Sequence, residues 1–242
     1  MNLQLSGKHA LVCGASQGIG RAAAIELAQL GADATLLARG SESLQRALDE
    51  LPRVDAAQKH GFIAADMNAH AALRAQVEAV ANASAVNILV NNSGGPPGGS
   101  AHAAALDDFR IAFNQHLIAA QIILQAILPG MQASGYGRII NVISTSVKEP
   151  IRNLGVSNTI RGAVASWAKT LATELGSHGI TVNNVLPGYT RTQRLDQILA
   201  DRSKASGNSE QQVAEAMLAT VPARRFAEAA EIASAIAFLA SP

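Results

Sequence analysis

Cysteine is almost absent from this sequence: the 242 residues include one, Cys13. A single thiol excludes an intrachain disulfide framework and suits a reducing compartment, so we expect a cytoplasmic protein. The opening residues also lack a basic stretch followed by an apolar one, so the sequence predicts no signal peptide.

Excess charge and uninterrupted apolar segments are missing as well. The 19 basic and 18 acidic residues leave a formal net charge of +1, which predicts neither a nucleic acid nor an acidic polymer as partner. The most apolar helical stretch, Leu117 to Met131, contains Gln121, Gln125 and Pro129, so we predict no membrane span. The sequence predicts no metal site.

Aromatic residues make up only 3% of the chain, although 48% of its residues are hydrophobic. Alanine and aliphatic side chains must therefore fill the core. The length suits one large α/β domain, and no long linker or repeat divides it. We therefore treat residues 1–242 as a single domain.

Short apolar runs alternate with segments of helical period along the chain. The strand-like runs are His9–Cys13, Ala34–Ala38, Gly61–Ala65, Ile88–Asn91, Arg138–Ile143 and Thr181–Leu186. The helical segments between them are Ile19–Leu30, Ser41–Leu51, Ala69–Ala81, Leu106–Ala133 and Val156–Leu175. Strands separated by such helices require crossovers, which predicts an α/β fold with a parallel sheet.

One segment, residues 191–218, breaks this rhythm. It places a polar stretch, Asp201 to Gln211, between apolar flanks. We interpret it as the most mobile part of the chain, and a substrate lid is one interpretation.

A glycine-rich loop joins the first strand to the first helix. It contains Gly14, Ser16, Gln17, Gly18, Ile19 and Gly20. Glycines allow unusual backbone angles and close approach of the chain to a pyrophosphate. The helix that follows offers unpaired N–H groups and a positive dipole to an anion. The arrangement of strand, glycine turn and helix predicts a Rossmann dinucleotide site.

The spacing of these glycines, G-x-x-x-G-x-G, resembles that of the short-chain dehydrogenase/reductase superfamily in its classical branch. Three later segments resemble motifs of that family in the expected order: Asn91-Asn92-Ser93-Gly94, Gly137 to Val142, and Pro187-Gly188-Tyr189-Thr190-Arg191-Thr192. The resemblance runs from about Gly7 to Ser241. It implies a doubly wound sheet in the strand order 3-2-1-4-5-6, with helices on both faces, and an oxidoreductase that acts on a small molecule.

The end of the second strand indicates which dinucleotide binds. It reads Leu36 to Ser41 with no carboxylate at its tip, whereas an acidic residue there favours NAD. Arg39 offers a guanidinium fork suited to the 2′-phosphate of NADP, and Ser41 adds a hydroxyl. We therefore predict NADP(H) as the cofactor.

The family resemblance extends the predicted cofactor site beyond this tip. It implies that Asp66 and Met67 border the adenine and that Asn92 to Gly94 run past the adenosine ribose. The full set of residues that we predict to bind the cofactor is Gly14, Ser16, Gln17, Gly18, Ile19, Gly20, Arg39, Ser41, Asp66, Met67, Asn92, Ser93, Gly94, Arg161, Pro187, Gly188, Thr190 and Thr192.

The resemblance also implies a catalytic tetrad of Asn, Ser, Tyr and Lys, most of which is altered here. Ser144 occupies the family's serine position after the fifth strand. The tyrosine and lysine positions, thirteen residues on and four further, are Ser157 and Arg161. The segment Gly162-Ala163-Val164 that follows sets this register without gaps.

The asparagine position is changed too. Counting from Phe109, or back from Gly137, places it at His116, while Asn114 lies two residues earlier. Two helical residues differ by about 200° in direction, so both cannot face one site. The site contains Asn114 instead of His116 if the register slips by two.

These substitutions change the available chemistry. A phenol has a pKa near 10 and a nearby cation brings it within range of acid–base work, whereas serine is far less acidic and arginine does not relay protons. We predict that Ser144 and Ser157 bind the substrate oxygen and that Arg161 anchors the nicotinamide ribose. The proton would come from water or from His116, whose ordinary pKa is about 6.5. Tyr189 is expected to pack its ring on the lid.

Two functions compete on this basis. The first is an atypical NADPH-dependent oxidoreductase that transfers hydride to a small carbonyl or an activated alkene. The alternative is a catalytically silent NADP(H)-binding protein that serves as a sensor or partner subunit.

Two expectations concern assembly and the end of the chain. The family resemblance predicts a homodimer or homotetramer built on Leu106–Ala133 and Val156–Leu175. Family members usually continue past the helix Glu228–Leu239 into a seventh strand. This sequence ends at Ser241-Pro242, so that strand is either absent or not included.

Overall fold

The fold is built on one parallel sheet. A computed structural model describes residues 2–242. Six strands pair in parallel in the order β3-β2-β1-β4-β5-β6, which confirms the predicted doubly wound topology. Their bounds are β1 His9–Cys13, β2 Asp33–Ala38, β3 Gly61–Ala64, β4 Ile88–Asn91, β5 Gly137–Val142 and β6 Ile180–Val185. The described residues add no seventh strand to this sheet.

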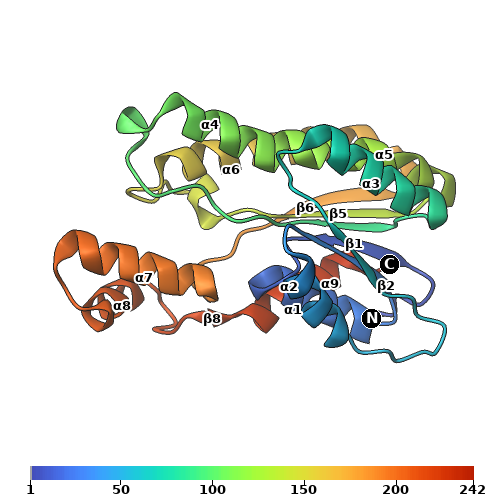
Figure 1. Cartoon of the computed structure of the whole chain (residues 1–242), viewed down its shortest axis with the longest axis horizontal. Coiled ribbons are helices and arrows are strands. Elements are labelled where there is room, and N and C mark those ends of the chain that lie inside the picture. Colours follow the sequence, from blue (N-terminus) through green and yellow to red (C-terminus); the bar gives the residue numbers. More distant parts are fainter. Residues whose placement is uncertain (1) are drawn as a thin grey trace.

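Helices cover both faces of the sheet (Figure 1). One layer contains α1 Gly18–Gln29, α2 Ser41–Asp49 and α9 Ala229–Ala240. The opposite layer contains α3 His70–Ala83, α4 Leu106–Phe113, α5 Ala119–Ser134 and α6 Gly155–Leu175. Because both faces are covered, β1 is apolar on each: Ala10 and Val12 belong to one core, Leu11 and Cys13 to the other.

The predicted helix Leu106–Ala133 is continuous but changes its winding in the middle. A π-helical turn, Asn114–Ile118, joins α4 to α5. Such turns occur frequently at functional sites, because the extra residue redirects side chains. Here His116 is buried while Asn114 is exposed.

This helix also bears on the membrane prediction. By length and composition, Leu106–Ser134 is sufficient to cross a bilayer. Buried helices of globular proteins meet the same criterion, and α5 packs into the core beside β5. The expectation of no membrane span therefore stays a prediction.

The segment after β6 leaves the sheet and forms a small unit beside it (Figure 1). It consists of β7 Thr190–Arg191, α7 Gln193–Ser206, α8 Glu210–Ala219 and β8 Ala227–Glu228. Leu195, Val213, Met217 and Phe226 form its own core. Tyr189 packs edge-to-face on Phe226, with ring centroids 6.2 Å apart, which confirms the prediction of a packed ring. The polar stretch predicted as mobile is largely helical.

Candidate active site

The glycine loop is shaped by backbone contacts that exclude side chains. Gly14 and Gly18 have φ angles of +59° and +57°, which strain any other residue. A Cβ atom on Gly14 would lie 2.7 Å from Asn92 Nδ2, and one on Gly20 would collide with the Gly14 carbonyl. The Asn92 amide donates to the Cys13 and Gly14 carbonyls at 3.4 and 3.3 Å. Asn92, which directly follows β4, therefore closes one side of the glycine loop.

The first helix supplies the other part of this cradle. It begins at Gly18, and no side chain caps its N-terminal N–H groups. Thr192, at the start of α7, approaches from the opposite side: its Cγ2 would lie 3.3 Å from a Cβ on Gly18. Unpaired N–H groups, a glycine surface and a flanking threonine fit a dinucleotide pyrophosphate.

The segment after β6 holds its predicted residues in a tight turn. The Thr190 hydroxyl donates to the Gly188 carbonyl at 3.2 Å, and the Thr192 hydroxyl donates to the Thr190 carbonyl at 3.3 Å. These bonds fix the turn, and Thr192 at its end lies close to Gly18 of the glycine loop.

The tip of β2 presents an exposed cation. Arg39 is exposed, and the hydrogen bonds and ion pairs among residues 2–242 do not involve its side chain. Ser41 is also exposed and begins α2. Asp66, after β3, is exposed and accepts from the Asn68 N–H at 2.9 Å. A solvated guanidinium with unused donors suits a phosphate dianion.

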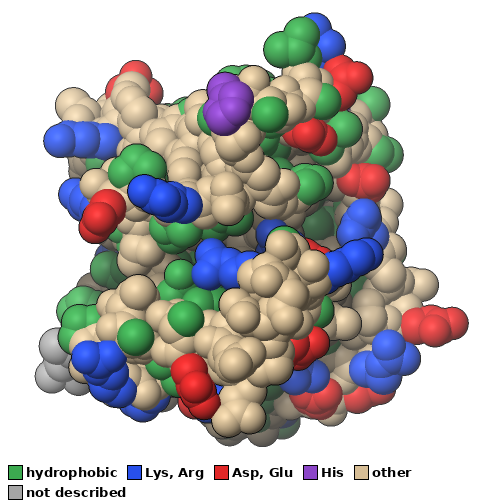
Figure 2. Space-filling view, turned by 90° about the vertical axis from the view of Figure 1, so that its left-hand side faces the viewer, with side chains coloured by type: hydrophobic (Ala, Val, Ile, Leu, Met, Phe, Trp, Pro, Cys, Tyr) green, Lys and Arg blue, Asp and Glu red, His purple; other side chains and the backbone are tan. Residues whose placement is uncertain are grey.

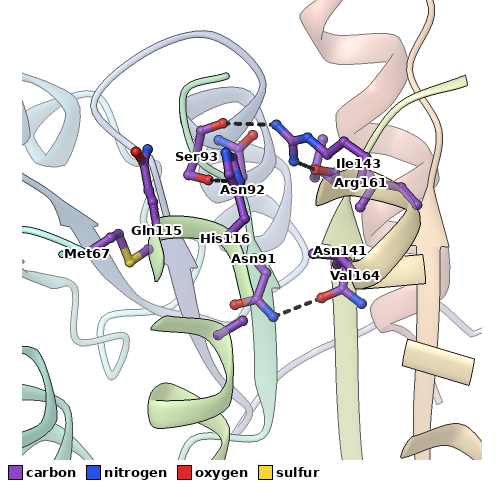
Figure 3. Close-up of a pocket in the computed structure, with 12 residues that line it drawn as sticks. Met67, Asn91, Asn92, Ser93, Gln115, His116, Asn141, Ile143, Arg161 and Val164 are labelled. Carbon is purple, nitrogen blue, oxygen red and sulfur yellow. Dashed lines mark hydrogen bonds between the residues drawn. The ribbon is translucent and has the colours of Figure 1, made fainter. Parts of the chain in front are cut away.

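A buried hydrogen-bonded cluster occupies the carboxyl edge of β4 and β5. Arg161, on α6, donates to the Val142 carbonyl at 2.8 Å and to the Ser93 carbonyl at 3.4 Å. The Ser93 hydroxyl forms a 2.7 Å hydrogen bond with His116 Nδ1 (Figure 3). Ser93 therefore connects the residues that occupy the family's lysine and asparagine positions.

The cluster settles which residue of the π turn faces the site. His116 lies against Ser93 and Arg161, whereas Asn114 lies on an outer groove with Phe113. The register with His116 at the asparagine position therefore matches the geometry. Gln115, in the same π turn, also lines the site, and its side chain donates to the Gly94 carbonyl at 3.2 Å.

The charge state of this cluster differs from the expectation. Burial, together with the positive charge of Arg161, lowers the pKa of His116 to about 3. The imidazole is therefore neutral at working pH, which favours water over His116 among the two predicted sources of the proton. Burial also lowers the pKa of Arg161 to about 10, with a contribution from Arg194, so Arg161 remains charged.

A cavity of about 20 Å³ lies at the centre of the cluster (Figure 3). His116 and Asn91 both line it, and their Nε2 and Oδ1 atoms are buried without a hydrogen-bond partner among the described residues. A polar cavity of this size accommodates one water molecule. Unpaired buried polar atoms are costly, so a water between these side chains is favoured.

An asparagine row supports the floor of this cavity. The Asn91 amide donates to Asn141 at 2.9 Å, and the Asn141 amide donates to Asn184 at 3.0 Å. The three residues lie in register on β4, β5 and β6. The sequence contained these residues, but only the pairing of the strands reveals that they bond in a row.

Ser144 and Ser157 do not line the cavity, whereas Arg161 does, so the predicted convergence of all three on one pocket is not seen at this cavity. Ser144 Oγ accepts from the Ser146 N–H at 3.1 Å, which leaves its own proton available. Ser157 lies on α6 one turn before Arg161, so the two side chains share a helix face. Both serines are half-buried.

One guanidinium at the site was not predicted. Arg194, in the first turn of α7, donates to the Pro96 carbonyl at 3.1 Å and lies beside Gly95. It comes from the segment interpreted as a lid, where the sequence gives no signal of which loop a single basic residue contacts. Its position becomes visible only when α7 is placed beside the loop after β4.

Comparisons with known proteins agree with this geometry. Residues 8–203 match the family model for short chain dehydrogenases. A 3-oxoacyl-[acyl-carrier-protein] reductase of Vibrio cholerae is 35% identical over 243 residues, covering 99% of this chain and 92% of the relative.

Solved structures show the same likeness. L-sorbose reductase from Gluconobacter frateurii, complexed with NADPH and L-sorbose, superposes with a TM-score of 0.91 at 30% identity, covering 100% of this chain and 92% of that one. YwfH, an NADPH-dependent reductase involved in bacilysin biosynthesis, gives a TM-score of 0.88 at 27% identity, with 98% and 92% coverage. The chain therefore belongs to the short-chain dehydrogenase family of oxidoreductases, as its motifs predicted.

Proposed function

We propose that this protein is an NADP(H)-dependent oxidoreductase that reduces a small carbonyl compound or an activated alkene. The glycine cradle and the exposed Arg39 support NADP(H) as the cofactor. The sorbose reductase and YwfH, which resemble the chain over almost all of its length, are described with NADPH. The residues that would hold the cofactor are the predicted set named above, from Gly14 to Thr192.

The observation that carries the proposal is the buried cation beside this cradle. Arg161 retains a positive charge at the edge of β4 and β5 and is held by two carbonyls. The nicotinamide, when bound, supplies the hydride. In this proposal Arg161 anchors the nicotinamide ribose and provides a fixed positive potential. A preorganised charge stabilises developing negative charge without itself exchanging a proton.

Ser144 and Ser157 complete the set of donors. The Ser144 hydroxyl accepts from a backbone N–H and so has its proton directed elsewhere, which suits a donor to a substrate oxygen. Ser157 occupies the same helix face as Arg161 and offers a second hydroxyl. Neither serine is acidic enough to replace a phenol as a general acid. Reduction of an activated alkene suits such a site, because it does not require a proton at the carbonyl oxygen.

In this proposal the proton that completes the reduction comes from water and not from a protonated His116. Neutral His116 has one ring nitrogen bonded to Ser93 and the other directed to no protein partner. We infer that this nitrogen holds a water in the small cavity, from which a proton reaches the product. His116 is then a positioning residue for that water.

A catalytically silent NADP(H)-binding protein is the second candidate. The observation in its favour is that no tyrosine or lysine lines the cavity between Arg161 and His116 in the described chain. The imidazole of His116 is also unprotonated near neutral pH, so it offers no acidic proton in place of the missing phenol. This candidate predicts cofactor binding without turnover.

Oxidation of NADPH against ketones, ketoacyl thioesters and enones distinguishes the two candidates. Turnover of at least one class supports the reductase, whereas tight NADPH binding with no turnover supports the silent protein. The variant Arg161→Ala should weaken both cofactor binding and rate. An unchanged rate in this variant would show that Arg161 has no role in catalysis.

We further propose a homodimer or homotetramer. Leu106, Ile111 and Phe113 of α4 are 72%, 54% and 38% exposed, which is unusual for large apolar side chains in one short helix. Phe113 also lines a groove of about 460 Å³ between α4 and α6. Light scattering should give at least twice the monomer mass, and a stable monomer at micromolar concentration would refute this assembly.

Two further proposals concern the lid and the location. Residues 191–218 form a separate helical unit whose first turn contacts the glycine loop, which suits a lid over bound cofactor and substrate. Cys13 is buried, and burial raises its pKa to about 12, so the thiol is inert. A lone inert thiol supports a cytoplasmic location.

A further inference from the structure

Two guanidinium groups from different helices bond the same short loop after β4. Arg161 of α6 donates to the Ser93 carbonyl at 3.4 Å, and Arg194 of α7 donates to the Pro96 carbonyl at 3.1 Å. Three residues of chain span at most about 10 Å, so both cations lie along one wall of the site. Gly95, between them, leaves space: a Cβ there would lie 3.7 Å from the Arg194 Nη2 atom.

Neither guanidinium has a carboxylate partner among residues 2–242. The five ion pairs among residues 2–242 involve other arginines, and no acidic residue lines the cavity beneath Ser93. Arg194 is close enough to contribute to the lowered pKa of Arg161. Two like charges without a counter-charge raise the local potential, and a site of this kind attracts an anion.

The pyrophosphate of the cofactor does not account for Arg194. Thr192, two residues earlier, approaches Gly18 of the phosphate loop, whereas Arg194 approaches Gly95 and Pro96. Two positions at the start of α7, two residues apart, thus face two different parts of the site. The Arg194 guanidinium donates one hydrogen bond to a carbonyl, so most of its five N–H groups remain available to a ligand.

The surface around this wall is open to a ligand. Arg194 is exposed at the start of α7. The face of the molecule formed by α7, α8 and the adjoining end of the α4 layer is hollowed, and Lys and Arg side chains lie beside the hollow (Figure 2). A small anionic substrate can therefore reach Arg194 from solvent.

We propose that Arg194 is a specificity-determining residue that binds an anionic group, a carboxylate in the simplest case, of the carbonyl or alkene substrate. This inference rests on the proposed reductase function. Arg194 reaches over from the lid helix, so it links recognition of the anion to closure of α7 on the loop after β4. The guanidinium fork matches a planar carboxylate with two parallel hydrogen bonds.

The test compares benzoylformate with its neutral methyl ester. Calorimetry on protein loaded with NADP⁺ measures binding of each ketone without turnover. The wild-type protein should bind the acid at least tenfold more tightly than the ester. Arg194→Gln should weaken binding of the acid about 10- to 100-fold, the range for a charge-assisted pair, and change the ester less than threefold. Lys204→Gln, an exposed cation further along α7, is the matched control and should change neither.

Three results would overturn the proposal. They are equal affinity of the wild-type protein for acid and ester, unchanged affinity of Arg194→Gln for the acid, or weaker NADP⁺ binding in that variant. The last result would assign Arg194 to the cofactor.

Oxidation of NADPH with the same two ketones separates this proposal from the proposed function. Binding as expected without oxidation would leave Arg194 as an anion site and refute the reductase for these substrates. Oxidation of both ketones at similar rates in the wild-type protein and in Arg194→Gln would support the reductase and refute the role of Arg194.

Discussion

The site has two halves that meet at β1. One half is formed mainly by backbone atoms and the other by side chains. On the β1–β2 side, the pyrophosphate cradle consists of backbone: glycines with positive φ, unpaired N–H groups and carbonyls closed by Asn92. On the β4–β6 side, the site consists of side chains, with Ser93, His116 and Arg161 joined by hydrogen bonds. The first half matches the family motifs residue by residue, whereas the second departs from them at most of the catalytic positions.

Physical constraints explain this difference. A backbone cradle tolerates few changes, because a Cβ atom on Gly14 or Gly20 has no space. A side-chain cluster tolerates replacement when its members change together and keep their hydrogen bonds. In this protein Arg161 carries the charge of the family's lysine, and Ser93 connects it to His116. This division agrees with our proposal that the cofactor cradle is kept while the acid–base chemistry differs.

The largest effect should come from the backbone half. We expect Gly14→Val to raise the Kd for NADPH by about 100-fold or more, because its left-handed backbone costs about 1–2 kcal/mol and the side chain meets Asn92. Fluorescence titration of NADPH measures this change. Gly162→Ala, where a Cβ meets nothing, is the control and should bind normally. Normal binding by Gly14→Val would contradict the contrast between the halves.

The next effect concerns the side-chain half. Ser144→Ala should lower kcat about 100-fold, the loss typical of one preorganised donor, while the Kd for NADPH stays within twofold of the wild-type value. Steady-state kinetics on a substrate found in the panel measures kcat. Thr145→Ala, an exposed neighbouring hydroxyl, is the control and should leave kcat unchanged. An equal loss of cofactor affinity in Ser144→Ala would place Ser144 in the cradle.

The buried imidazole should appear in the pH dependence of stability. His116 has a folded pKa of about 3 and an ordinary unfolded value near 6.5, so between these two pH values the unfolded chain binds the proton and the folded chain does not. The free energy of unfolding should therefore fall as pH falls, by about 1.4 kcal/mol per pH unit from this group.

The variant His116→Asn tests this dependence. Its loss of stability between pH 6 and pH 4 should be shallower than that of the wild-type protein in denaturant titrations. The variant His102→Asn, at an exposed histidine, should retain the wild-type slope. A wild-type rate profile with a limb near pH 6.5 that His116→Asn abolishes would show that the imidazole titrates in the normal range.

We expect the smallest effect on cofactor affinity from a substitution at the exposed tip of β2. Arg39→Ala should weaken NADPH binding about tenfold and leave NADH binding unchanged, because a solvated charge-assisted contact is partly screened. The difference between the two cofactors should shrink as salt is added. Arg53→Ala, an exposed arginine elsewhere, should change neither affinity. Equal losses for NADPH and NADH would assign Arg39 to something other than the 2′-phosphate.

Much of the fold was predictable from the sequence because its signals are local. Alternating apolar runs and helical segments indicate a parallel sheet, and the ordered motifs identify the family and the strand order. Positions counted from those motifs assigned His116 and Arg161 to the family's asparagine and lysine positions, whereas the bonds of Ser93 to both residues appear only in the structure. The π turn was not predictable, because an extra residue in a helix leaves no pattern that composition or period reveals.

Burial and pairing account for what was missed. The pKa of His116 depends on desolvation and on Arg161, forty-five residues away in sequence. The asparagine row needs the register of three strands, and the position of Arg194 needs α7 to lie beside the loop after β4. Sequence by itself determined the fold class, the family and the cofactor cradle, since each follows from short-range steric and periodic rules. Only the tertiary structure decided the charge state of the site and its second arginine, because electrostatic interactions depend on distance and solvent, which the chain order does not contain.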